Sequence, residues 1–218
     1  KIVLRKRLSG KPVSKIFNVV YFYGLSLKIN NNVLSPRQET EILVNEALKA
    51  IKSENKVLDL CTGSGAIALA IKENIDCEVI ASDISFKALK IAEYNVKKFK
   101  QNIRLVHSDL FSNINEKFDV IVSNPPYISL SEMKELDDEV KKYDPIISLY
   151  GGEDGLDFYR QIIKEAKNHL TCNGTILFEI GYRQGESVKN LLENEGFCVK
   201  VVQDFEKRDR VVIGKLKI

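Results

Sequence analysis

The sequence has few of the features that mark membrane proteins, secreted proteins or metal centres. No apolar run approaches the roughly 18 residues of a membrane helix, and residues 1–10 lack the apolar segment of a signal peptide. The two histidines and four cysteines are scattered without a CxxC pair, so no metal site is expected. The G-x-S-x-G element of many hydrolases is missing too. We therefore expect a cytoplasmic protein that folds without disulfides.

Acidic residues are missing from the first 38 positions. This segment carries eight basic residues, whereas the other 180 residues carry 25 basic and 30 acidic ones, a net charge of −5. Such a basic head could steer the protein to an RNA-rich or acidic partner, or it could be a solvated arm. Because the chain begins with Lys1 and not with methionine, we also suspect that an upstream segment is missing.

The order of apolar patterns predicts an α/β fold. Short β-rich runs alternate with helical patterns, which is typical of a doubly wound, mostly parallel sheet. The alternation around Gly24 predicts a small β-hairpin over 20–29, so we divide the chain into a basic segment with hairpin (1–34) and a catalytic domain (35–218). Seven strands are expected at 57–60, 78–82, 103–106, 118–123, 175–180, 197–202 and 210–215, and helices at 38–51, 66–72, 85–98, 155–170 and 185–195.

A glycine-containing loop follows the first of these strands and opens a helix. It reads Asp59-Leu60-Cys61-Thr62-Gly63-Ser64-Gly65, and its glycines permit a tight turn close to a ligand. Asp83 ends the next strand twenty residues after Gly63, where doubly wound folds use an acid to bind a ribose diol. The loop is neither a Walker A motif nor a complete G-x-G-x-x-G. A ligand with a ribose and no phosphate therefore fits better, and S-adenosylmethionine is such a molecule.

Other residues near the strand ends complete the expected cofactor site. Asp59 could meet a cationic amino group or order the loop. Asp109 could accept a hydrogen from the adenine amino group or cap a helix, while Leu110 and Phe111 could pack on the adenine face or belong to the core. Ile84, next to Asp83, is also assigned to this site.

A second loop carries the expected chemistry. Asn124-Pro125-Pro126-Tyr127 follows the fourth strand, and the prolines cannot extend a sheet because they lack N–H groups. We expect the Asn124 side-chain oxygen and the backbone carbonyl that follows to accept the two hydrogens of a substrate –NH2 group. Tyr127 offers a flat face to a planar amide or base. These acceptors favour positive charge on the nitrogen during methyl transfer, which lowers the barrier.

Together these motifs resemble the HemK/PrmC-type protein-(glutamine-N5) methyltransferases, a class I S-adenosylmethionine-dependent family. Four further segments carry the resemblance. They are the P-R-x-x-T-E element at 36–41, the G-G-x-D-G-L element at 151–156, Glu179-Ile180-Gly181-Tyr182, and the stretch 208–212.

The resemblance implies a substrate and further site residues. It implies that Asn124 to Tyr127 hold the glutamine of the Gly-Gly-Gln motif of peptide chain release factors, and that S-adenosylhomocysteine is the product. Thr40 and Glu41 are implied to lie near the cofactor. Cys61 departs from the family, which has glycine there, and Leu110 replaces a tryptophan found in some relatives. Family members carry an N-terminal helical domain that docks the release factor, of which only the basic end, 1–15, would remain.

Several alternatives stay open at this stage. The same reaction could act on another protein, such as a ribosomal protein. Adenine N6 methylation of nucleic acid also uses an Asn-Pro-Pro-Tyr loop, but residues 39–218 are net negative, which disfavours a nucleic acid groove. A non-catalytic binding module is disfavoured by the intact Asn124 and Asp83. We expect a monomer that does not bind membranes.

Overall fold

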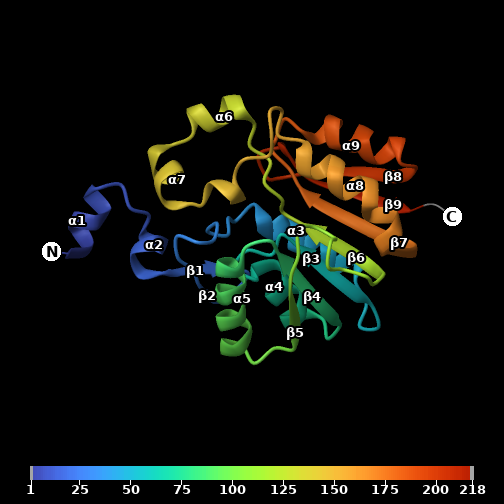
Figure 1. Cartoon of the computed structure of the whole chain (residues 1–218), viewed down its shortest axis with the longest axis horizontal. Helices are drawn as coiled ribbons and strands as arrows, with labels where there is room; N and C mark the ends of the chain where they lie inside the picture. Colours follow the sequence, from blue (N-terminus) through green and yellow to red (C-terminus); the bar gives the residue numbers. More distant parts are fainter. Residues whose placement is uncertain (1, 217–218) are drawn as a thin grey trace.

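Seven strands form one mixed sheet at the centre of the computed structural model, which describes residues 2–216. The sheet order is β5-β4-β3-β6-β7-β9-β8 (Figure 1). Strands β3 to β7 run parallel to one another, and β9 runs antiparallel to both β7 and β8. The predicted doubly wound sheet with an antiparallel edge is confirmed. The strands are β3 (Lys56–Leu60), β4 (Glu78–Asp83), β5 (Ile103–His107), β6 (Phe118–Ser123), β7 (Leu170–Glu179), β8 (Phe197–Gln203) and β9 (Asp209–Leu216).

Five helices cover the two faces of the sheet, as predicted. On one face lie α3 (Thr40–Ala50), α4 (Ala66–Asn74) and α5 (Phe86–Lys98), and on the other lie α8 (Asp157–His169) and α9 (Gly185–Asn194) (Figure 1). The Ser85 hydroxyl caps α5 by accepting a hydrogen bond from the Ala88 backbone N–H at 3.2 Å. Within residues 2–216, every helix is too short or too polar to cross a membrane.

Strand β7 begins five residues earlier than predicted. It starts at Leu170, which pairs with Phe118, and the register with β6 then shifts before Thr175 pairs with Val120. The Asn-Gly pair at 173–174 indicates a turn by sequence, but here it lies in the irregular part of one continuous strand. The register shift explains how the strand keeps its direction despite these residues.

The N-terminal segment contains the predicted hairpin and two short helices that were not predicted. The helices are α1 (Ile2–Leu8) and α2 (Val13–Phe17), and the hairpin is β1 (Val19–Phe22) with β2 (Leu25–Lys28). Asn95 on α5 holds the hairpin, since its side chain accepts from the Lys28 N–H at 2.8 Å and donates to the Lys28 carbonyl at 2.9 Å. The hairpin therefore packs against α5 on the outside of the main sheet.

Residues 130–148 form a second unpredicted helical segment, which packs near the N-terminal helices (Figure 1). It contains α6 (Leu130–Glu135), α7 (Asp138–Tyr143) and a 3-10 turn, η1 (Ile146–Ser148). The ammonium of the fully buried Lys15 lies 2.8 Å from the Asp144 carboxylate, and Arg37 lies 3.4 Å from it. Arg7 pairs with Glu139 at 3.1 Å. Part of the basic head is thus neutralised within the protein, a role that sequence reasoning did not consider.

Candidate functional site

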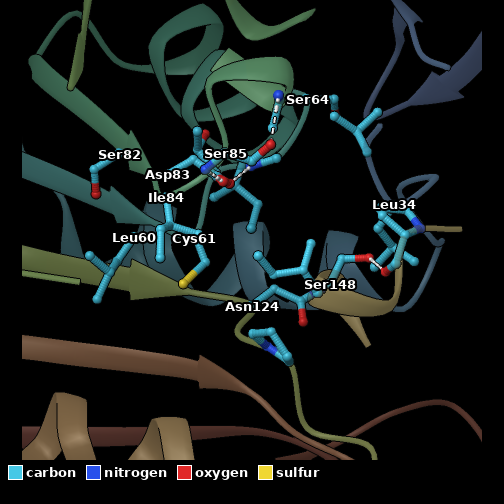
Figure 2. Close-up of a pocket in the computed structure, with 18 of the residues that line it drawn as sticks. Leu34, Leu60, Cys61, Ser64, Ser82, Asp83, Ile84, Ser85, Asn124 and Ser148 are labelled. Carbon is cyan, nitrogen blue, oxygen red and sulfur yellow. Dashed lines mark hydrogen bonds between the residues drawn. The ribbon is translucent and has the colours of Figure 1, made fainter. Parts of the chain in front are cut away.

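A pocket of about 400 Å³ lies at the carboxyl ends of β3, β4 and β6, where open α/β sheets bind ligands. Figure 2 shows Cys61 and Asn124 on neighbouring parts of its lining, with Asp83 further along and with Leu34 and Ser148 on another side. The structure thus brings both predicted loops to one cavity, which we call the larger pocket. The predicted residues that line it are Thr40, Cys61, Thr62, Gly63, Ser64, Asp83, Ile84, Asp109, Leu110, Asn124 and Pro126.

The glycine loop adopts a left-handed backbone at three alternate positions. Cys61, Gly63 and Gly65 have φ angles of 65°, 55° and 79°. Glycine takes this conformation freely, whereas a residue with a Cβ pays roughly 1 kcal/mol or more. At Cys61, where the resemblance leads us to expect glycine, the left-handed backbone therefore adds local strain.

Asp59 lies beneath this loop and is fully buried. Its Oδ2 accepts hydrogen bonds from the Thr62 hydroxyl at 2.6 Å and from the Ala68 backbone N–H at 3.0 Å. Burial raises the pKa of this carboxyl to about 7, against the effect of those two bonds. Of the two roles considered for Asp59, the geometry supports the ordering of the loop.

Asp83 connects the ends of β3 and β4 at the pocket surface. Its Oδ2 accepts from the Gly63 N–H and its Oδ1 from the Ser85 N–H, both at 2.8 Å. Burial raises the pKa of Asp83, while the two backbone bonds lower it. Because a carboxylate has about four acceptor sites, two remain for hydroxyl groups of a ligand in the pocket.

The residues after β5 divide between the pocket and the core. Exposed Asp109 and half-buried Leu110 line the pocket, which suits the predicted adenine site. Phe111 is outside the lining and buried, and its ring stacks on His169 with centroids 4.3 Å apart. For Phe111 the geometry therefore supports the core interpretation that the sequence left open.

The double-proline loop is held by close contacts with two glycines of the 151–156 element. A Cβ on Gly151 would lie 2.7 Å from the Pro126 carbonyl oxygen, and one on Gly155 would lie 2.4 Å from the Tyr127 oxygen. The Gln184 side chain also donates to that Tyr127 carbonyl at 2.9 Å. These glycines are needed because the loop packs where a side chain would collide.

Asn124, at the start of the double-proline loop, contacts the first helix. Its Nδ2 donates to the Thr40 hydroxyl oxygen at 3.4 Å. Glu41, the next residue on α3, is outside the lining, and its Oε1 accepts from the Tyr23 N–H at 2.7 Å. The structure thus brings Thr40 to the predicted site and directs Glu41 to the hairpin.

A second, smaller pocket of about 250 Å³ adjoins Asn124 from the other side. Tyr127 lines this smaller pocket and not the larger one. Charged side chains contribute to its lining, namely Arg37, Glu39, Glu179 and Arg210. Pro125 and Gly65 are buried and outside both linings, so they shape the two loops from within.

Sequence reasoning missed several residues that line these pockets. No site role was predicted for Val33, Leu34 and Ser148, which line the larger pocket. Glu179 offered a usable signal, because it ends the apolar run 176–178 in the same way that Asp83 ends β4. An acid at the carboxyl end of a buried parallel strand is a candidate site residue, and both Asp83 and Glu179 have this position.

Relatives of known name match most of the chain. A family model described as a methyltransferase small domain matches residues 37–140. The release factor glutamine methyltransferase of Clostridium acetobutylicum is 43% identical over 220 residues, which cover 97% of this chain and 77% of that protein. The protein of the same name from Streptococcus pneumoniae is 45% identical over 215 residues, with coverages of 97% and 77%.

Solved structures agree with this relationship. A methyltransferase from Pyrococcus furiosus superimposes with a TM-score of 0.70 at 20% identity, covering 99% of this chain and 98% of that one, which shows the shared fold. A release factor-specific protein-(glutamine-N5) methyltransferase from Alicyclobacillus acidocaldarius has a TM-score of 0.53 and 26% identity, covering 84% of this chain and 94% of that one. The chain belongs to the release factor glutamine methyltransferase family.

Proposed function

We propose that the protein transfers a methyl group from S-adenosylmethionine to the side-chain amide N5 of the glutamine in the Gly-Gly-Gln motif of a peptide chain release factor. The observation that carries the proposal is that Asn124 lines both pockets. A cofactor in the larger pocket and a glutamine side chain in the smaller one would meet at this residue. Family membership supports the choice of glutamine as the substrate.

The larger pocket fits the cofactor in size and in its polar groups. A volume of about 400 Å³ is within the usual range for small-molecule sites, roughly 300–1,000 Å³. A Cβ added to Gly63, which lines the pocket, would meet no atom within 4 Å, so the space beside the loop is open to a ligand. Asp83 would hold the ribose hydroxyls and Asp109 the adenine amino group, while Thr62 and Ser64 would line the methionine part.

The protein's own residues would activate and orient the substrate nitrogen. An amide nitrogen is a poor nucleophile because its lone pair is conjugated with the carbonyl. Acceptance of both N–H hydrogens by Asn124 and the backbone carbonyl that follows it would favour localisation of that lone pair and stabilise positive charge on nitrogen. Fixed placement of the amide contributes further by proximity. When bound, S-adenosylmethionine supplies an electrophilic methyl on its sulfonium, and the amide proton can leave to water as or after the methyl arrives.

The test is methylation of an intact release factor. The protein is incubated with S-adenosylmethionine and the release factor, and the digest is mapped by peptide mass. We expect one added methyl, located on the Gly-Gly-Gln glutamine, and none on a release factor whose glutamine is replaced by asparagine.

Parallel incubations test the alternatives with the same readout. A ribosomal protein fraction and an oligonucleotide with unpaired adenines serve as competing acceptors. Methyl transfer to either of these, with the release factor unmodified, would overturn the proposed substrate.

A further inference from the structure

Two buried polar atoms in the side chains that line the smaller pocket have no hydrogen-bond partner within residues 2–216. They are the Oε2 atom of Glu179 and the Nε atom of Arg210. Glu179 ends β7 and is 2% exposed, and the Arg210 side chain on β9 is 11% exposed. Buried polar groups are almost always paired in folded proteins. An unpaired acceptor and an unpaired donor in one pocket therefore indicate a ligand that pairs with both.

The other polar atoms of these two side chains already have partners within the protein. The Glu179 Oε1 accepts from the Tyr127 hydroxyl at 3.4 Å. The Arg210 Nη1 donates to the Ile180 carbonyl and its Nη2 to the Asp204 carboxylate, both at 3.3 Å. The ion-pair partner of Arg210 is thus Asp204 and not Glu179. The two remaining atoms, Oε2 and Nε, are left to a ligand rather than to each other.

The smaller pocket leads from the protein surface to the proposed reaction site. Arg37 and Glu39 in its lining are exposed, whereas Glu179 is buried and Asn124 also lines the larger pocket. Apolar side chains make up much of the remaining lining, namely Leu34, Ile128, Leu136, Val140 and Leu149. In a pocket of this kind, a few polar groups fix the orientation of the ligand. The two unpaired atoms are suited to that role.

The hydrogen-bond groups of a Gly-Gly-Gln segment limit what these atoms can bind. Burial raises the pKa of the Glu179 carboxyl to about 7, against the effect of Arg210, so above this pH the group is ionised and can only accept. The two hydrogens of the glutamine NH2 are already assigned to Asn124 and the carbonyl that follows it. Glycine has no side-chain donor, so the donors that remain on the segment are its peptide N–H groups.

We propose that Glu179 binds the main chain of the substrate, with Oε2 accepting a peptide N–H of the Gly-Gly-Gln segment, and that Arg210 Nε donates to a carbonyl of the same segment. This inference rests on the proposed function and deepens it, because it names the part of the substrate that the smaller pocket recognises. A charged acceptor makes a stronger hydrogen bond than a neutral one. Because glycine has no Cβ, its main chain can approach a carboxylate inside a pocket closely. The pocket therefore favours a glutamine that follows glycines.

The first test compares Glu179→Leu with wild type in the release factor assay at pH 8. We expect the KM for the release factor to rise by about tenfold, the scale for losing a hydrogen bond to a charged group. The kcat and the dissociation constant of S-adenosylmethionine should change by less than about threefold, because a bond that is equal in the bound substrate and in the transition state affects KM alone. Glu179→Gln keeps an oxygen acceptor and should raise KM less. An unchanged KM in Glu179→Leu would overturn the assignment.

Glu46→Leu is the matched control. Glu46 is another nearly buried carboxylate, 8% exposed and on α3, but it faces Lys49 and Lys200 and is outside the linings of both pockets. Its loss removes a buried charge without touching the proposed substrate contact, so the KM for the release factor should equal that of wild type. An equal rise of KM in Glu46→Leu and Glu179→Leu would contradict a specific role of Glu179.

A second pair of variants tests the donor. Arg210→Lys keeps the positive charge but lacks the Nε–H group, so the KM for the release factor should rise. Asp204→Asn weakens the ion pair on the outer side of Arg210 without changing Nε, and KM should stay at the wild-type value. An equal rise in both variants would mean that the ion pair matters and not the Nε–H group, which would overturn the role assigned to Arg210.

A change in the substrate separates main-chain binding from an effect on the shape of the pocket. The intact release factor is made with an α-hydroxy acid in place of either glycine or the glutamine, which replaces one peptide N–H by an ester oxygen. With wild type, one of these esters should raise KM by about tenfold. With Glu179→Leu the same ester should change KM by less than about twofold, because the acceptor for that N–H is already missing. Glu179→Gln replaces Glu179→Leu in this comparison if the latter fails to fold.

The failures of the two proposals can be distinguished. If wild type leaves the unmodified release factor without a methyl group, the proposed function fails and the inference with it. If wild type methylates the glutamine but no ester raises KM, or each ester raises it equally in wild type and Glu179→Leu, only the inference is overturned.

Discussion

The two sides of the larger pocket are held by different forces. On one side, which we call the floor, the loops after β3, β4 and β6 are fixed by short bonds to backbone groups. Around the glycine loop, Asp59 and Asp83 accept three hydrogen bonds from backbone N–H groups and one from the Thr62 hydroxyl. The Ser123 hydroxyl donates to the Leu60 carbonyl at 2.7 Å. Because these loops continue directly from neighbouring parallel strands, the sheet sets their relative positions.

The opposite side, the wall, consists of residues 32–36 and 145–148, which are outside the main sheet. The Lys15 ammonium joins its two parts. It donates to the Asn30 and Val33 carbonyls at 2.8 and 2.6 Å and lies 2.8 Å from the Asp144 carboxylate. We infer that the two sides have different roles. The floor determines the chemistry of the pocket. The wall, whose two parts the buried Lys15 ammonium joins, stabilises the fold and encloses the ligand.

The largest effect is expected from a change in the floor at Asn124. Asn124→Ala removes the side-chain acceptor at the junction of the two pockets, so methyl transfer should be lost, by at least a thousandfold or about 4 kcal/mol. Cofactor affinity should stay within a few fold, because Asp83 and the glycine loop are unchanged. Single-turnover kinetics and calorimetry measure the two quantities. Equal loss of cofactor binding would contradict this division of labour.

The next effect is expected from the wall, at Lys15. Lys15→Met keeps the length of the side chain but leaves Asp144 and two carbonyls without their partner. Loss of one member of a buried pair costs roughly 3–5 kcal/mol, and we expect the lower end because Arg37 still lies 3.4 Å from Asp144. Urea unfolding should show this loss, while kcat at saturating cofactor stays near that of wild type.

A second substitution tests whether the lost stability comes from the unpaired carboxylate. Adding Asp144→Leu to Lys15→Met replaces the pair with apolar groups, which is often neutral for stability. The double variant should recover more than half of the loss. If it is less stable than Lys15→Met, the wall depends on Asp144 for a reason other than the ion pair.

The floor was more predictable from sequence than the wall because its parts are contiguous. Strand, turn and the start of a helix follow one another from Val57 to Ala66, and a strand leads directly into the double-proline loop from Phe118 to Tyr127. Local pattern and topology therefore placed both loops at one edge of the sheet. The helices of 130–148 have six residues or fewer, too few for a clear apolar period. Ser129 and Glu132 form a capping box for α6, a signal that was present in the sequence.

Contacts between segments that are distant in the chain could not be predicted from the sequence. The contact of Thr40 with Asn124 and that of Tyr127 with Glu179 each join distant segments, and they depend on the position of α3 beside β6 and β7. Thr40 and Glu41 looked equivalent in the motif, yet consecutive helical residues point in different directions, and only Thr40 reaches the pocket. Phe111 is adjacent to the site in sequence, but burial against His169 directs it to the core.

A moderate effect is expected where the floor meets the cofactor, at Asp83. Asp83→Ala removes the ribose acceptor and leaves the Gly63 and Ser85 N–H groups without partners, so S-adenosylmethionine binding should weaken by roughly 1–3 kcal/mol. Asp83→Asn keeps one oxygen acceptor and should lose less. Calorimetry measures both, and an unchanged dissociation constant in Asp83→Ala would reject the assignment.

The smallest effect is expected at the outer edge of the wall, at Arg7. The Arg7–Glu139 pair joins α1 to α7 at 3.1 Å, but the two side chains are 48% and 38% exposed. Exposed pairs contribute about 0–1 kcal/mol and weaken as salt screens them, so Arg7→Ala should change the urea midpoint little, and less still at high salt. If Arg7→Ala lost as much stability as Lys15→Met, the total charge of the wall would matter more than whether an ion pair is buried. A small loss beside a large one at Lys15 would show that burial of a single ammonium makes the difference.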